Sequence, residues 1–162
     1  MAERIKVGDP IPSVKLKLLT DNGMDEVDTA ELTKGKKVVM FAVPGAFTPT
    51  CSAKHLPGFI QHTDKFAAKG VDRIICLSVN DPFVMKAWGE QSGVNERVLM
   101  LPDGNAEFTK AMGLDLDASG FGLGTRSQRF AMLIEDGTVK DLQVDEGGAF
   151  EVSSAEYMLN RV

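Results

Sequence analysis

The chain has little cysteine, no long apolar run and no cluster of basic residues, and each shortage excludes a class of protein. Only two cysteines, Cys51 and Cys76, occur in 162 residues, too few for the disulfide framework of a small secreted domain. No apolar run approaches the roughly 20 residues that span a bilayer, and no signal-peptide core is visible. The net charge of -5 disfavours nucleic-acid binding. We therefore expect a cytoplasmic protein that binds neither nucleic acid nor membranes.

The length and composition fit one globular domain. The chain is 43% hydrophobic and 25% charged, which is ordinary for a soluble protein. A chain of this length buries roughly two thirds of its unfolded surface without staples. Because no repeat, low-complexity segment or linker divides it, we expect residues 1–162 to form a single domain.

Strands alternate with helices along the chain, which predicts an α/β fold with a mixed sheet. Alternating residues around a turn predict an N-terminal hairpin, and Asp136-Gly137 is a strong signal for a second hairpin near the C-terminus. Apolar, β-branched runs predict buried strands between these hairpins, at residues 36–43, 73–79 and 97–102. Helices are predicted at residues 30–34, 51–69, 82–91, 105–113 and 153–162.

Local signals indicate where some of these helices begin and bend. Thr29 is predicted to cap the first helix, Asp81 the helix that Pro82 opens, and Ser153 or Ser154 the last one. Pro57-Gly58 lies within the predicted helix 51–69 and is expected to kink it.

Cys51 follows the end of a buried strand instead of lying inside an apolar run. The strand at 36–43 ends in Pro44-Gly45, and Pro49 suits the first turn of a helix. Cys51 is therefore predicted in that first turn, where free N–H groups and the helix dipole stabilise an anion. Such surroundings lower the pKa of a thiol. Open α/β sheets also bind ligands at the carboxyl ends of their strands, so Cys51 is a candidate nucleophile.

Residues 44–51, PGAFTPTC, carry a PxxxTxxC pattern at Pro44, Thr48 and Cys51. Together with SVNDPFVMKAW and GLGTRSQRFAML, this segment resembles the type II, or peroxiredoxin-5-like, peroxiredoxins, from about Val7 to the C-terminus. The resemblance implies a thioredoxin fold, with a central mixed sheet flanked by helices and an N-terminal β-hairpin extension. It also implies a cofactor-free thiol peroxidase that reduces hydrogen peroxide and alkyl hydroperoxides.

The resemblance further implies roles for single residues. The Cys51 thiolate would attack a peroxide oxygen and become a sulfenic acid. Thr48 would hydrogen-bond near the sulfur, Pro44 would shield it, and an arginine from a distant strand would complete the pocket. The motif favours Arg126 for that position, with Arg129 as a supporting candidate, because the two would lie on opposite faces of one regular strand.

Cys76 has two interpretations. Within the apolar run RIICLSV it fits a buried, inert residue. It could also resolve the Cys51 sulfenic acid through a disulfide, although the 7 Å limit between Cα atoms would then require local unwinding of the helix. We favour reduction by an external thiol, namely glutathione, glutaredoxin or thioredoxin. The resemblance also suggests a homodimer, for which Phe83, Met85 and Trp88 are packing or interface candidates.

Other functions are less well supported. His55 and His62 follow Cys51 on the same predicted helix, but they are too few ligands for a zinc site. A Cys–His hydrolase pair lacks a second orienting group. Two further hypotheses stand beside the peroxidase. One is a redox sensor that uses the same Cys51 and passes oxidation to a partner, and the other is a thioredoxin-fold binding module without chemistry.

Overall fold

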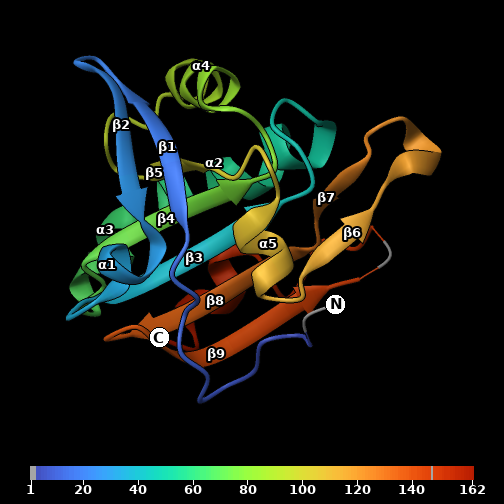
Figure 1. The fold of residues 1–162 in the computed structure, drawn as a ribbon. Coiled ribbons are helices and arrows are strands. Elements are labelled where there is room, and N and C mark those ends of the chain that lie inside the picture. The colour runs from blue at the N-terminus through green and yellow to red at the C-terminus, as the bar shows by residue number, and fades with distance from the viewer. Residues whose placement is uncertain (1–2, 147) are drawn as a thin grey trace.

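A five-stranded mixed sheet forms the centre of the molecule (Figure 1). The computed structural model describes residues 3–146 and 148–162. The strands lie in the order β5-β4-β3-β8-β9. Strands β3, β4 and β5 are parallel, β8 pairs antiparallel with β3, and β9 pairs antiparallel with β8. In the order of the sheet they span Leu99–Pro102, Arg73–Ser78, Lys37–Val43, Arg129–Glu135 and Thr138–Asp145. The predicted α/β architecture with a mixed sheet is confirmed.

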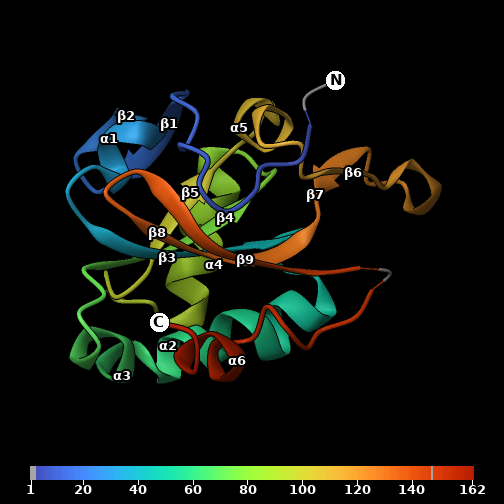
Figure 2. The ribbon, with the colours of Figure 1, turned by 90° about the horizontal axis from the view of Figure 1, so that it is seen from below.

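Two small antiparallel hairpins lie outside this sheet. The first pairs β1 (Lys15–Thr20) with β2 (Gly23–Asp28) and is the predicted N-terminal hairpin. The second pairs β6 (Asp115–Asp117) with β7 (Thr125–Ser127) and projects from one side of the molecule in both views (Figures 1 and 2). It includes a short 3-10 turn at Ser119–Phe121.

The helices are short and cover both faces of the sheet (Figure 2). A π-helical turn, η1 (Cys51–His55), leads directly into α2. The α-helices are α1 (Thr29–Thr33), α2 (Leu56–Gln61), α3 (Thr63–Ala68), α4 (Pro82–Ser92), α5 (Glu107–Ala111) and α6 (Ala155–Leu159).

Alternation along β3 builds a core on each face of the sheet. Val39, Phe41 and Val43 point to the face covered by α2, α3, α4 and α6, where Cys51 is also buried. Val38 and Met40 point to the opposite face, which the N-terminal segment and α5 cover. Since both faces are buried, β3 needs the continuous apolar run that its sequence shows.

The helix predicted at 51–69 was right in extent but wrong in its break. Pro57 does not kink it, because this proline lies in the first turn of α2, where its missing N–H is not needed. The chain instead leaves helical geometry at His62, with φ -107° and ψ 12°. The Nδ1 atom of His62 lies 2.7 Å from the carbonyl oxygen of Gly58 at this break.

Two of the three predicted caps are confirmed. Asp81 accepts the N–H of Val84 at the start of α4, and Ser154 accepts that of Tyr157 in α6. The prediction of Thr29 was wrong by one residue: Asp28 accepts the backbone N–H groups of α1. Thr29 instead donates its hydroxyl to the carbonyl of Pro12, 2.5 Å away, which ties α1 to the segment before β1.

Candidate active site

Cys51 lies in the first helical turn after β3, as its sequence context predicts. The helix begins at Pro49, and the N–H of Ser52 donates to the carbonyl of Thr48 at 2.9 Å. From Cys51 to His55 the turn is widened into a π-helix, a rare geometry that is frequent at functional sites. The Cys51 side chain is fully buried. A buried thiol reacts readily only if polar groups stabilise its anion, so its neighbours decide its chemistry.

Arg129 supplies the positive charge next to the sulfur. Its Nη2 atom lies 3.2 Å from the Cys51 Sγ, and the side chain is 8% exposed. The assignment of this place to Arg126 was therefore wrong. The two arginines do not share one regular strand, because β7 ends at Ser127, β8 begins at Arg129, and Gln128 lies between them. The expectation that the two side chains lie on opposite faces holds only within one regular strand, so it does not apply to them.

Arg126 supports the loop that precedes the thiol. Its Nη1 atom donates to the carbonyl of Val79 at 3.2 Å and to that of Pro44 at 3.5 Å, while its Nε donates to Leu123 at 3.1 Å. The guanidinium thus joins the end of β3, the end of β4 and the β6–β7 hairpin. A Cβ atom added to Gly45 would lie 3.0 Å from Cγ2 of Thr48 and 3.2 Å from Nη1 of Arg126, so a larger residue there would require both side chains to shift slightly.

Thr48 and Pro44 lie in the same loop as part of a tight turn. The Thr48 hydroxyl donates to the carbonyl of Gly45 at 2.6 Å, which leaves the lone pairs of its oxygen to accept a hydrogen bond. Pro44 contributes its carbonyl to Arg126. The structure therefore brings Thr48, Pro44 and Arg126 together as one braced loop, and Arg129 with Cys51 as a hydrogen-bonded pair.

His55 is part of this site, and sequence reasoning missed that role. Its Nδ1 lies 2.8 Å from Nη1 of Arg129, and its Nε2 lies 2.8 Å from the carbonyl of Ser153. Burial, followed by the Arg129 charge, lowers the pKa of His55 from 6.5 to about 3, so the imidazole is neutral at physiological pH. The spacing of one helical turn after Cys51 was the available signal.

Asp145 orders the segment that holds Ser153. This carboxylate accepts the N–H groups of Glu151, Val152 and Ser153 and the Ser153 hydroxyl, at 2.6–3.1 Å. Burial would raise the pKa of the Asp145 carboxyl, but these hydrogen bonds outweigh burial and hold the pKa below its usual range. A continuous hydrogen-bonded path therefore runs from Asp145 through Ser153, His55 and Arg129 to Cys51.

Known proteins are similar to this chain in both fold and sequence. The Redoxin family model matches residues 6–159. The chain is 51% identical to peroxiredoxin-2B of Arabidopsis thaliana over 96% of each chain. It is 55% identical to the chloroplastic peroxiredoxin-2E-2 of Oryza sativa, over 96% of this chain and 71% of that one. Reduced Prx3 of Vibrio vulnificus in complex with H2O2 is 55% identical, with a TM-score of 0.93 over 97% and 98% of the two chains.

The chain belongs to the type II peroxiredoxins. Its α/β architecture is the thioredoxin fold of that family, as the sequence resemblance implied. This peroxiredoxin is a thiol-dependent peroxidase, an oxidoreductase that acts on peroxide.

The second thiol of the peroxiredoxin lies in different surroundings. Cys76 is fully buried in β4, where Phe41 of β3 and Met100 of β5 are its register partners. Burial first, and the neighbouring Cys51 second, raise the pKa of the Cys76 thiol. Both cysteines are free thiols in the structure.

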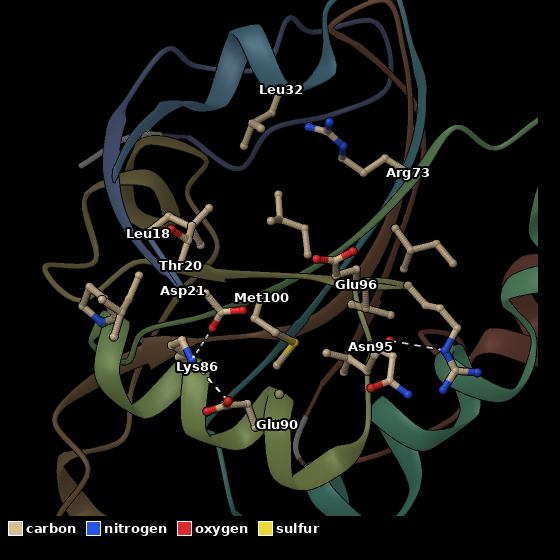
Figure 3. A pocket seen from close by; sticks show the side chains of 18 of the residues that line it. Leu18, Thr20, Asp21, Leu32, Arg73, Lys86, Glu90, Asn95, Glu96 and Met100 are labelled. Atoms are coloured by element: carbon tan, nitrogen blue, oxygen red, sulfur yellow. Dashed lines mark hydrogen bonds and ion pairs between the residues drawn. The ribbon is translucent and has the colours of Figure 1, made fainter. Parts of the chain in front are cut away.

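A large hollow in the peroxiredoxin lies away from the thiol site (Figure 3). It has a volume of about 920 Å³ between the β1–β2 hairpin, α4 and β5. Lys86 reaches Asp21 at 3.3 Å and Glu90 at 3.2 Å across its rim. Its lining mixes acidic, basic and apolar side chains and includes neither Cys51 nor Arg129. The hollow is therefore separate from the Cys51 site, which is identified by the contacts of Cys51 and not by the size of a cavity.

The described residues show neither a metal-binding cluster nor a membrane-spanning helix. Within residues 3–146 and 148–162, no group of three His, Cys, Asp or Glu side chains is arranged to hold a metal ion. In the same part of the chain no helix has the length and apolar character needed to cross a bilayer. Both nitrogens of His55 are already engaged within the protein.

Proposed function

We propose that Cys51 is the peroxidatic nucleophile, which reduces hydrogen peroxide and alkyl hydroperoxides through a sulfenic acid. The main support for this proposal is the 3.2 Å distance between Nη2 of Arg129 and the Cys51 sulfur. A guanidinium remains protonated at physiological pH, and a cation at this distance favours thiolate over thiol. The 55% identical Vibrio vulnificus protein, crystallised with H2O2, supports the choice of substrate.

The proposed reaction balances with one proton. The Cys51 thiolate attacks one oxygen of ROOH, a sulfur–oxygen bond forms, and the oxygen–oxygen bond breaks. Sulfur is oxidised to Cys51-SOH, and the leaving oxygen takes up a proton to give ROH or water. Negative charge develops on the leaving oxygen, so N–H donors of Arg129 and the loop around Thr48 are the groups positioned to stabilise it.

An external thiol then restores Cys51. One thiol condenses with the sulfenic acid, forms a mixed disulfide and releases water. A second thiol reduces that disulfide and leaves as the oxidised reductant. We propose glutaredoxin with glutathione, or thioredoxin, as this reductant. The burial of Cys76 inside β4 favours an external thiol over an internal resolving cysteine.

Peroxide turnover tests this proposal. Wild-type protein is mixed with hydrogen peroxide or tert-butyl hydroperoxide, and consumption is followed with glutathione plus glutaredoxin or with thioredoxin plus its reductase. Many turnovers per protein are expected, together with a dimedone adduct on Cys51 when the reductant is withheld. Consumption of one equivalent followed by silence would instead support the redox sensor. No adduct on Cys51 would contradict the sulfenic acid.

We also propose that the peroxiredoxin forms a homodimer through Phe83 and Phe47. Phe83, at the start of α4, is 64% exposed, and Phe47 is 46% exposed. The Phe47 ring lies 6.4 Å from that of Trp88, on the same helix, so both exposed rings border α4. Met85 and Trp88, the other interface candidates, are buried and belong to the core. A Phe83→Asp variant is expected to run as a monomer in light scattering, whereas wild type runs as a dimer.

The cytoplasmic location is proposed from the sequence composition. The chloroplastic relative from Oryza sativa makes a plastid the main competing compartment. A fluorescent fusion expressed in the native cell tests the proposal: diffuse cytoplasmic fluorescence is expected, and fluorescence confined to an organelle would contradict it.

A further inference from the structure

The His55 ring is held in one orientation by contacts on both of its nitrogens. A carbonyl oxygen has no hydrogen to give, so the Nε2 atom facing Ser153 must carry the proton. The imidazole is neutral, and Nδ1 therefore offers a lone pair. Nη1 of Arg129, 2.8 Å from Nδ1, can only donate to it. The contacts thus specify the tautomer: a proton on Nε2 and an acceptor at Nδ1.

Aromatic side chains surround the same ring. Its centroid lies 4.9 Å from that of Phe41, 5.0 Å from that of Phe150 and 5.7 Å from that of Phe59. The Phe150 ring also lies 5.8 Å from Cζ of Arg129. The imidazole and the guanidinium are therefore packed as well as hydrogen-bonded, which restricts rotation of both groups.

Arg129 uses two different nitrogens for its two contacts. Nη1 faces His55 and Nη2 faces the Cys51 sulfur. Because the guanidinium is planar and rigid, an acceptor that fixes Nη1 also fixes the direction of the N–H groups on Nη2. Without the acceptor at Nδ1, the guanidinium could rotate about its flexible stem. The orientation that brings Nη2 to the sulfur would then be one of several orientations of the side chain.

A neutral acceptor has an advantage over a carboxylate at this position. A carboxylate would also orient the guanidinium, but it would cancel the charge that favours the Cys51 thiolate. The carboxylate in this path is Asp145, and its oxygens accept from Ser153 and the neighbouring backbone instead of from Arg129. It orders the segment carrying the Ser153 carbonyl, and within residues 3–146 and 148–162 no carboxylate forms an ion pair with Arg129.

We infer that His55 is a positioning residue of the peroxidase reaction, which aims the Arg129 guanidinium at the Cys51 sulfur without neutralising it. This role rests on the proposed function of Cys51, because the aimed N–H groups serve the thiolate and the attacked peroxide. His55 itself touches neither the sulfur nor the substrate in this scheme. It acts through Arg129, and Ser153 and Asp145 hold it from the other side.

Three variants test the role. His55→Phe keeps a ring of similar size but removes the acceptor. His55→Asn can place an amide oxygen near the position of Nδ1 and so restores the acceptor. His62→Phe is the matched control, because His62 follows on the same helical segment and its ring is hydrogen-bonded to the nearby Gly58 carbonyl, away from Arg129 and Cys51. The readouts are the second-order rate constant for hydrogen peroxide and the thiolate absorbance of Cys51 against pH, in a Cys76→Ser background.

The expected results differ among the variants. His55→Phe should lose at least tenfold in rate constant and move the midpoint of the thiolate titration to higher pH. His55→Asn should stay within about threefold of wild type, and His62→Phe should match it. Wild-type values for His55→Phe in both readouts would overturn the inference. Equal losses in His55→Phe and His55→Asn, with an unmoved titration, would also overturn it, because that pattern indicates a structural role alone.

A measurement on the unmodified protein protects the test from variants that do not fold. Nitrogen-15 NMR of the imidazole should show a protonated Nε2 and an unprotonated Nδ1 from pH 5 to pH 8. A proton on Nδ1 would overturn the inference, since Nδ1 could not then accept from Arg129. Failure of the proposed function looks different: wild type would not turn over peroxide, whereas the tautomer and the thiolate titration would still report on His55.

Discussion

The two cysteines of this peroxiredoxin share their burial and differ in their partners. Both side chains are fully buried and both belong to the same hydrophobic cluster. Cys51 has a guanidinium N–H 3.2 Å from its sulfur, whereas Cys76 is paired with Phe41 and Met100 across the sheet. Burial raises the pKa of Cys76. Exposure therefore does not distinguish the two thiols, whereas the guanidinium beside the Cys51 sulfur does.

The backbone around each thiol reinforces the contrast. Cys51 lies in the first turn of a helix, where N–H groups are free and the dipole favours an anion. Cys76 lies within a central strand whose backbone groups are paired on both sides. The two thiols thus differ in backbone setting, a helix start for Cys51 and a fully paired central strand for Cys76.

The largest expected effect is from removal of the nucleophile. Cys51→Ser should abolish peroxide turnover to the level of the buffer, because a serine hydroxyl cannot form the sulfenic acid. Turnover with each reductant system measures it, with circular dichroism to establish the fold. Residual activity above a few per cent would assign the nucleophile to Cys76 and reverse the contrast.

Removal of the charge beside the sulfur should have the next largest effect. Arg129→Ala should lower the rate constant for peroxide about 100-fold, roughly 2.7 kcal/mol, as expected for loss of one aligned donor in a buried site. Arg129→Lys keeps the charge but loses the fork that reaches both Cys51 and His55, so about tenfold loss is expected. Stopped-flow kinetics measures both. A wild-type rate for Arg129→Ala would return the role to Arg126.

Acid should destabilise the region around Cys51 through His55. The folded-state pKa of about 3 lies below the unfolded value of 6.5, so the unfolded chain binds more protons between these limits. The stability contributed by neutral His55 is therefore fully present above about pH 6.5 and lost as the pH falls towards 3, by an amount of the order of a few kcal/mol. Urea unfolding at pH 7 and pH 4.5 measures the loss, and His55→Phe should reduce it. An equal loss in both proteins would contradict the assignment.

A smaller effect is expected from removal of Arg126, which supports the loop before Cys51. Arg126→Ala removes donors to Pro44, Val79 and Leu123 but leaves the Arg129–Cys51 contact in place. We expect a three- to tenfold lower rate constant, caused by loosening of the loop that carries Thr48. Arg126→Lys is the matched variant, since its amine can still reach one carbonyl. A loss as large as that of Arg129→Ala would place Arg126 in direct contact with the substrate.

The smallest effect is expected at the second thiol. Cys76→Ser should change turnover less than twofold with either reductant, because Cys76 contributes packing and not a reactive sulfur. Mass spectrometry of oxidised wild type should find no Cys51–Cys76 disulfide. If this disulfide appears and Cys76→Ser loses turnover with thioredoxin, Cys76 is a resolving cysteine and the contrast fails.

The parts of the site that the sequence could predict are those set by local pattern. The strand, turn and helix start around Cys51 follow from an apolar run, Pro44-Gly45 and Pro49. The choice between Arg126 and Arg129 depends instead on where β7 ends and β8 begins, which nearby residues do not determine. His55 has a suitable spacing, but its role arises from Arg129 and Ser153, which lie 74 and 98 residues away.

The same reasoning applies to the fold. Alternation and turn residues predicted the hairpins and the buried strands, because these signals act over a few residues. The break at His62 and the π-turn at Cys51 were not predicted, because the residues at these positions carry no turn or helix-breaking signal. The cap at Asp28 was missed because Thr29, its neighbour, is an equally suitable capping type whose hydroxyl is used by a distant carbonyl.

The long sequence separation in the site links chemistry to folding. Cys51 and Arg129 are 78 residues apart, and they meet only when β8 pairs with β3 in the completed sheet. In an unfolded chain Cys51 is an ordinary thiol without its guanidinium or its helix. The proposed reactivity of Cys51 towards peroxide therefore requires the folded sheet. Peroxide consumption by Cys51 would then report how much of the chain is folded.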